Sequence, residues 1–253
     1  MKKNYRYLVI GAGGLLGSHL VSKILLSGAN VFAIDKDLEN MKNVLSLLNV
    51  DLDSSKLNLG ALDITNEADT KNFFNEIEHI DGAVNCSYPR GNNYGAPFFE
   101  VSQKDFNNNV SLHLGSAFVV MRECASYFNR KKNPFSLVNL ASIYGSCAPD
   151  FSIYDGTDMT TPVEYAAIKS AIIHLNKYVT SFISHSAFRV NSVSPGGLKA
   201  NQPKKFINAY KKKTLGHGMI SPEDVTGSIL FLLSDESSYI NGQDFIVDDG
   251  FSL

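Results

Sequence analysis

The residues best suited to chemistry are a tyrosine and a lysine four positions apart, Tyr165 and Lys169, within a helical pattern over 163–184. Positions i and i+4 share one helix face, so the phenol and the ammonium can reach the same ligand. A phenol with a pKa of about 10 is a weak base at neutral pH, and a neighbouring cation lowers that pKa. Ser142 ends an apolar strand pattern, and its hydroxyl can hydrogen-bond an oxygen on which charge develops. These three residues predict a site where Tyr165 moves a proton.

A glycine-rich turn, Gly11-Ala-Gly-Gly-Leu-Leu-Gly17, lies between a strand pattern over 7–10 and a helical pattern over 15–26. Missing side chains let the backbone approach a pyrophosphate, which the amides at the helix N-terminus stabilise. The candidate contacts of this turn are Gly11, Gly13, Gly14, Leu15, Leu16 and Gly17. The alternative is a tight turn with no ligand.

Asp35 ends the next strand pattern, over 31–34. A carboxylate there accepts hydrogen bonds from adenosine ribose hydroxyls and repels a 2′-phosphate. The pattern therefore favours NAD over NADP, and the adjacent Lys36 weakens that preference. The alternative is a solvated aspartate that caps a helix.

Strand and helix patterns alternate along the rest of the chain. Further strands are predicted over 57–62, 82–85, 135–140, 188–193 and 245–247, and further helices over 41–48, 67–77, 106–128 and 223–233. This alternation indicates an α/β fold, in which a parallel sheet carries helices on both faces. No repeat or linker divides the sequence, so we expect a single domain over residues 1–253.

Composition narrows the possible partners. The chain has 253 residues, 44% hydrophobic and 19% charged, and a net charge of −2, which disfavours nucleic acid and anionic membranes as partners. No run reaches the roughly 18–20 apolar residues that span a bilayer. The three cysteines (Cys86, Cys124 and Cys147) are odd in number and widely spaced, so we expect neither disulfides nor a metal site, and a cytoplasmic location.

In this order and on a chain of this length, the glycine turn, Asp35, Ser142, Tyr165 and Lys169 resemble a short-chain dehydrogenase/reductase. The resemblance covers nearly the whole chain and implies a Rossmann-type doubly wound sheet of about seven strands, a homo-oligomer (tetramer or dimer) and a Ser-Tyr-Lys site for hydride transfer. It adds the following candidate cofactor contacts: Asp63, Ile64, Asn85, Cys86, Pro195 and Gly196, with Tyr165 and Lys169.

A narrower resemblance links the chain to flagellin-modification oxidoreductases of bacterial nonulosonic (legionaminic-type) sugar biosynthesis. It is carried by segments such as Tyr88-Pro-Arg90, Leu112-His-Leu-Gly115, Pro162-Val-Glu-Tyr165, Asn201-Gln-Pro203 and Val247-Asp-Asp-Gly-Phe-Ser-Leu253. It implies a small-molecule substrate that is a sugar, sugar phosphate or nucleotide sugar. Arg90, Tyr154 and Gln202 are the candidate substrate contacts.

The sequence departs from the family pattern at several places. Cys86-Ser87-Tyr88 replaces an asparagine-alanine-glycine run, so bulk there narrows the pocket or contacts the substrate. His113 aligns with the family's catalytic asparagine, and we expect it either to hold a water beside Lys169 or to relay protons; the alternative is a buried structural histidine. The segment between Ser142 and Tyr165, residues 143–164, is longer than is usual in the family. We expect it to form a wall of the substrate pocket or to support a neighbouring subunit. The lysines between 204 and 213 bind phosphate or form a solvated face.

Two other functions remain open. A nucleotide-sugar epimerase or dehydratase would use the same Tyr165 and Lys169 with tightly held NAD, although the chain after Gly196 is short for such an enzyme. An NAD-binding sensor or assembly partner would need no turnover, and the presence of all three polar site residues argues against it.

Overall fold

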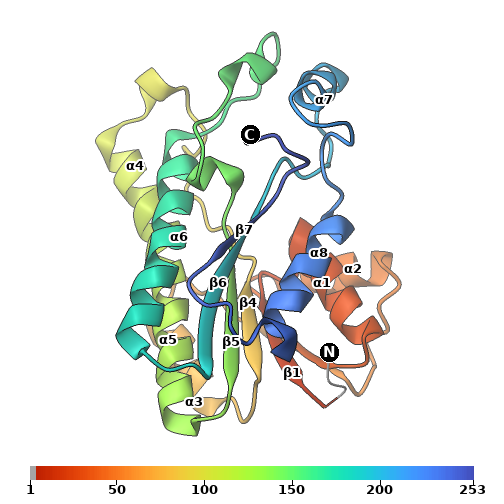
Figure 1. Ribbon diagram of the computed structural model, residues 1–253, viewed down its shortest axis with the longest axis vertical. Coiled ribbons are helices and arrows are strands. Elements are labelled where there is room, and N and C mark those ends of the chain that lie inside the picture. The colour runs from red at the N-terminus through yellow and green to blue at the C-terminus, as the bar shows by residue number, and fades with distance from the viewer. Residues whose placement is uncertain (1–3) are drawn as a thin grey trace.

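The computed structural model describes residues 4–253, and its core is one parallel sheet (Figure 1). The strand order is β3-β2-β1-β4-β5-β6-β7. The strands are β1 (Arg6–Ile10), β2 (Asn30–Asp35), β3 (Leu57–Ala61), β4 (Gly82–Asn85), β5 (Phe135–Leu140), β6 (Phe188–Pro195) and β7 (Asp244–Val247). The predicted doubly wound α/β fold with seven strands is confirmed.

Helices cover both faces of this sheet. They are α1 (Leu15–Leu26), α2 (Leu38–Leu47), α3 (Glu67–Glu76), α4 (Gln103–Asn109), α5 (Ser116–Lys131), α6 (Val163–Ile183), α7 (Lys204–Lys211) and α8 (Pro222–Leu233). Figure 1 shows α3, α5 and α6 on one face and α1, α2 and α8 on the other. Every residue of β5 and β6 is buried, as expected for strands covered on both sides.

The predicted helix over 106–128 is not one regular helix. It consists of α4, a π-helical segment (Val110–Gly115) and α5. A π turn inserts one residue into the hydrogen-bond ladder and rotates the residues that follow it, and such turns are frequent at functional sites. His113 lies in this segment.

The strands run upward in Figure 1, and four segments lie above their carboxyl ends. These segments are the loop after β4, residues 141–162, helix α7 and the C-terminal residues. Within residues 4–253, no helix is long and apolar enough to cross a membrane.

Candidate active site

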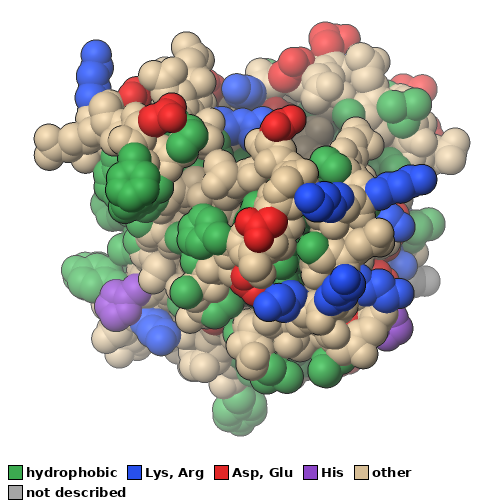
Figure 2. All heavy atoms as spheres, turned by 90° about the horizontal axis from the view of Figure 1, so that it is seen from above, with side chains coloured by type: hydrophobic (Ala, Val, Ile, Leu, Met, Phe, Trp, Pro, Cys, Tyr) green, Lys and Arg blue, Asp and Glu red, His purple; other side chains and the backbone are tan. Residues whose placement is uncertain are grey.

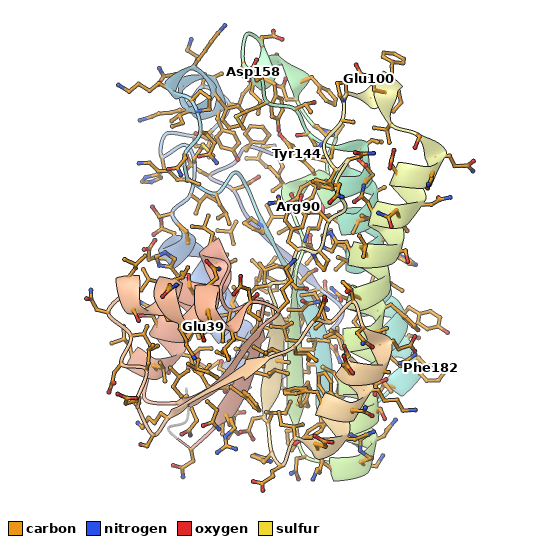
Figure 3. All side chains as sticks on the ribbon, turned by 180° about the vertical axis from the view of Figure 1, so that it is seen from behind. Glu39, Arg90, Glu100, Tyr144, Asp158 and Phe182 are labelled. Atoms are coloured by element: carbon orange, nitrogen blue, oxygen red, sulfur yellow. The ribbon has the colours of Figure 1, made fainter. Side chains whose placement is uncertain are left out.

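A cavity of about 820 Å³ opens at the carboxyl ends of the central strands, where doubly wound sheets bind ligands. The sequence-predicted site residues that line it are Gly11, Gly13, Gly14, Leu15, Leu16, Asp35, Lys36, Asp63, Ile64, Cys86, Arg90, Tyr165, Lys169 and Pro195. Figure 3 shows Arg90 and Tyr144 in this upper region, between the α1 and α2 side and the α6 side. The fold therefore brings predicted residues from six separate segments of the chain to one cavity.

The glycine turn fits a dinucleotide because side chains are excluded where the backbone must pack or face the cavity. Gly11 has a φ of +78°, and a Cβ there would lie 2.8 Å from the backbone nitrogen of Ser87. A Cβ at Gly17 would lie 2.2 Å from the carbonyl oxygen of Gly11, so Gly17 lets α1 begin directly against the turn. Gly13 and Gly14 line the cavity with backbone alone. The residues present fit the pyrophosphate of a nicotinamide dinucleotide.

Asp35 lies at the end of β2 and joins the turn to the cavity wall. Its Oδ2 accepts a hydrogen bond from the Gly13 amide at 2.9 Å, and its Oδ1 accepts one from the Asp37 amide at 3.2 Å. These two bonds fix the carboxylate at the rim, where it can accept hydrogen bonds from ribose hydroxyls. Asn85, at the end of β4, lies outside the lining and organises the next turn, because its Oδ1 accepts from both the amide and the hydroxyl of Ser87.

Ser142 lies close enough to Tyr165 for its side chain to influence the ionisation of the phenol. Ser142 is 4% exposed and lies just after β5, where its Oγ accepts a hydrogen bond from the Tyr144 amide at 3.2 Å. Burial raises the pKa of Tyr165 above its usual value, and the Ser142 side chain opposes that effect. The expected lowering of the Tyr165 pKa by Lys169 stays a prediction.

Lys169 is 4% exposed and lies one helical turn after Tyr165. Its Nζ donates a hydrogen bond to the carbonyl oxygen of Leu140 at 2.6 Å and lies 5.7 Å from the ring centroid of Tyr165. Burial lowers the pKa of Lys169 to about 8, because desolvation disfavours the ammonium. The lysine therefore changes protonation close to physiological pH.

His113 is 2% exposed, and burial lowers its pKa to about 2, with Lys169 contributing in the same direction. Among residues 4–253, no atom hydrogen-bonds its Nδ1. Burial thus favours the neutral imidazole. The expected roles of His113, holding a water or relaying protons, stay predictions.

Tyr88, in the loop after β4, is the centre of an aromatic contact that the sequence did not reveal. Its ring centroid lies 5.6 Å from that of Tyr165 and 5.1 Å from that of His113, and the Lys169 Nζ is 5.7 Å from it. The guanidinium carbon of Arg90 also lies 5.5 Å from the Tyr88 ring centroid. The sequence offered one sign of this contact, because Tyr88 stands where the family pattern has a glycine.

Several predicted residues lie outside the cavity lining: Gly17, Asn85, His113, Ser142, Tyr154, Gly196 and Gln202. The Tyr154 hydroxyl is used by Tyr144 and Thr161. The Gln202 side chain folds onto its own loop, bonding the Leu198 carbonyl and the Ala200 amide. Both polar groups are thus hydrogen-bonded to neighbouring residues, and their expected contacts with a substrate stay predictions.

The lysines between residues 204 and 213, in α7 and directly after it, do not line the main cavity either. Figure 2, which looks onto this end of the molecule, shows Lys and Arg side chains on the right of the face, interspersed with carboxylates. Lys205, Lys212 and Lys213 line a separate hollow of about 360 Å³. Lys213 forms an ion pair with Asp150 at 2.7 Å. Among residues 4–253, no cluster of three His, Cys, Asp or Glu side chains is arranged to hold a metal ion.

The fold and this cavity are those of a short-chain dehydrogenase/reductase, and comparison with known proteins shows that the chain belongs to this family. The family model described as enoyl-(acyl carrier protein) reductase matches residues 13–252. The protein is accordingly an enzyme, a dehydrogenase/reductase acting on CH–OH groups.

Two relatives are similar over nearly their full lengths. Post-translational flagellin modification protein A of Campylobacter coli is 35% identical, with all of each chain covered. A short-chain dehydrogenase of Leptospira borgpetersenii, solved with bound NAD+, is 31% identical with a TM-score of 0.86, covering 99% of this chain and 93% of that one. A gluconate 5-dehydrogenase of Burkholderia cenocepacia, solved with NADP and tartrate, shares the fold at 20% identity, with a TM-score of 0.82 and coverage of 98% and 94%.

Proposed function

We propose that this enzyme interconverts a secondary alcohol and a ketone on a sugar derivative, with NAD as the hydride carrier. The observation that carries the proposal is the grouping of Tyr165, next to Ser142 and one helical turn from Lys169, at the same cavity as the glycine turn. A bound nicotinamide supplies the hydride acceptor or donor.

The side chains of this site divide the remaining work. Tyr165 takes the hydroxyl proton in the oxidation and returns it in the reduction. Ser142 hydrogen-bonds the substrate oxygen on which charge develops, in the position its hydroxyl already holds beside the phenol. Lys169, buried with a pKa of about 8, binds ribose hydroxyls and, when protonated, stabilises the phenolate of Tyr165.

The cofactor preference rests on Asp35. Its carboxylate lines the cavity and is fixed by two backbone amides, so a 2′-phosphate would meet a negative charge that cannot turn away. Similarity to a relative solved with bound NAD+ supports the same choice. Lys36 lines the cavity beside Asp35 and favours NADP.

The proposed substrate is a sugar, sugar phosphate or nucleotide sugar in surface-glycan or flagellin-modification biosynthesis. Similarity to a flagellin modification protein supports this class. Arg90 supports an acidic member of it, because its guanidinium lines the cavity and, among the described residues, no carboxylate pairs with it.

The test follows NADH formation in the near ultraviolet, with NAD or NADP and a panel of hexose phosphates and nucleotide-linked amino sugars. We expect turnover with NAD, and Tyr165→Phe should lower kcat by about 10²–10⁴-fold without changing NAD affinity, because the ring remains and only the proton carrier is lost. Tyr178→Phe is the matched control, since Tyr178 is an exposed tyrosine on the same helix.

Retention of most of the rate in Tyr165→Phe would overturn this mechanism. Substrate conversion without net NADH, by protein that copurifies with NAD, would indicate the epimerase or dehydratase instead. NAD binding with no conversion of any sugar would favour the sensor.

A further inference from the structure

A buried polar pair, Asn109 and Glu164, joins the end of α4 to the first turn of α6. The two side chains are 1% and 0% exposed, and the Asn109 Nδ2 donates a hydrogen bond to the Glu164 Oε1 at 3.0 Å. Glu164 immediately precedes Tyr165, and Asn109 immediately precedes the π-helical segment that carries His113. The pair therefore lies between the two elements that hold the proposed catalytic side chains.

Burying this carboxylate is costly, since its Oε2 has no hydrogen-bond partner among the described residues. The positive end of the α6 dipole favours a carboxylate in the first turn, and an apolar pair of similar size would avoid the cost altogether. Because burying the Glu164 carboxylate costs free energy, we looked for a role of this pair other than packing.

The oxygen of the Asn109 side-chain amide points to such a role. Its Oδ1 accepts a hydrogen bond from the Gly91 amide at 2.8 Å, so Asn109 connects Glu164 to the loop after β4. A Cβ at Gly91 would lie 2.6 Å from the Asn108 Nδ2, which shows how closely the loop is drawn onto α4.

Gly91 directly follows the part of this loop that faces the cavity. Tyr88 and Arg90 both line it, with the Tyr88 ring against Tyr165 and the guanidinium near that ring. The Tyr88 hydroxyl also bonds the Tyr94 hydroxyl, beyond Gly91. The position of the Gly91 backbone thus determines how far Tyr88 and Arg90, which form the cavity wall, lie from the phenol of Tyr165.

We propose that Asn109 and Glu164 are positioning residues that clamp this loop through the Gly91 amide, and so hold Tyr88 and Arg90 at the distance from Tyr165 that substrate binding requires. The clamp itself follows from the contacts, whereas its effect on substrate binding rests on the proposed function.

Exchanging the two groups tests the clamp. Asn109→Asp keeps an oxygen for the Gly91 amide but sets two carboxylates against each other, so the pair should separate. Glu164→Gln keeps an oxygen for the Asn109 Nδ2 and should leave the clamp closed. In the double variant the new glutamine donates to the new aspartate, whose other oxygen still accepts from Gly91, so the clamp should be restored.

The first readout is hydrogen exchange at the Gly91 amide, which needs no substrate. We expect Asn109→Asp to accelerate it on the order of tenfold, the worth of one hydrogen bond, with near wild-type rates in Glu164→Gln and in the double variant. Amides of β5 serve as the internal reference. Equal Gly91 exchange in all four proteins, or equally fast exchange in Asn109→Asp and the double variant, would overturn the clamp.

If Asn109→Asp alone fails to fold, recovery of folding in the double variant is the supporting result, and failure of both overturns the proposal. The second readout is kinetic, with the substrate that the panel identifies. We expect KM for that substrate to rise on the order of tenfold in Asn109→Asp and to recover in the double variant, with NAD affinity unchanged.

An unchanged KM beside faster Gly91 exchange would refute the role in substrate binding and leave the clamp standing. Absence of turnover with any sugar in wild-type protein would count against the proposed function, while the exchange data would still decide the clamp.

Discussion

At the scale of single residues, burial controls the ionisation of the site more than neighbouring charges do. Desolvation is the largest influence on Tyr165, Lys169 and His113, raising the first pKa and lowering the other two. In this state the site thus favours a neutral phenol and a neutral imidazole, with an amine close to its titration midpoint at slightly alkaline pH.

The buried His113 should make the protein sensitive to acid. Its pKa is about 2 in the folded protein, against about 6.5 in an unfolded chain. Between these values the unfolded chain binds a proton that the folded protein does not, so the stability from a neutral His113 is complete above pH 6.5 and is lost as pH falls below it. The loss is about 1.4 kcal/mol for each pH unit below 6.5.

His113→Asn removes this titration, and urea unfolding at pH 7 and pH 5 measures it. We expect the wild type to lose about 1–2 kcal/mol more stability than the variant between these two pH values. Since the two proteins are otherwise identical, the effects of all other groups cancel in the comparison. Equal losses would mean that His113 is protonated in the folded state.

At the scale of elements, the sequence predicted what local periodicity and turn chemistry determine. The strands, the glycine turn before α1 and the shared face of Tyr165 and Lys169 all follow from short-range patterns, and the doubly wound sheet of about seven strands follows from the family resemblance. The π-helical segment was missed because it adds no proline or unusual composition, and its residues fit a helical pattern equally well.

The rest of the site depends on contacts between distant segments. The bond between Asn109 and Glu164 joins residues 55 positions apart, and neither residue type is unusual at its position. Tyr154 was predicted as a substrate contact because its side chain suits a polyol, and the sequence did not reveal that its hydroxyl joins Tyr144 and Thr161. Local sequence carries no signal for such pairings.

Two helical glycines should respond oppositely to the same substitution. Gly17→Ala places a methyl group 2.2 Å from the Gly11 carbonyl oxygen, so α1 must move away from the turn, and we expect a loss of roughly 1–3 kcal/mol. Gly227, within α8, has nothing within 4 Å of its Cβ position, and Gly227→Ala should add about 0.5–1 kcal/mol through helix propensity.

Chemical denaturation of both variants measures these free energies of unfolding. Titration with NAD measures the affinity of the glycine turn for the cofactor. Gly17→Ala should also weaken NAD binding, whereas Gly227→Ala should not. A neutral Gly17→Ala variant would show that the turn and α1 can separate at little cost.

At the scale of the whole molecule, the C-terminal residues hydrogen-bond the segment that follows α7, above the cavity. The Asp249 Oδ2 accepts hydrogen bonds from the amides of Gly216, His217 and Gly218, at 3.1, 2.6 and 3.0 Å. These backbone bonds help to lower the pKa of Asp249. One carboxylate thus ties the segment after α7 to the chain beyond β7. The expected homo-oligomer stays a prediction.

Asp249→Ala should release that segment without unfolding the sheet. We expect trypsin to cleave after Lys211, Lys212 or Lys213 several-fold faster in the variant, because proteolysis follows local opening. Asp155→Ala, on an exposed loop at the same end of the molecule, is the control. Unchanged cleavage at the three lysines would show that other contacts hold the segment.

The depressed pKa of Lys169 also gives the protein a distinctive reactivity. Because burial lowers the pKa of this amine to about 8, a larger share of it is unprotonated at mildly alkaline pH than of an ordinary lysine, whose pKa is about 10.4. The amine lines the cavity, so a small acylating reagent or aldehyde that enters there meets a nucleophile that the surface lysines do not match. Covalent labelling at mildly alkaline pH would then mark the site itself, and protection by a dinucleotide would report its occupancy without any knowledge of the substrate.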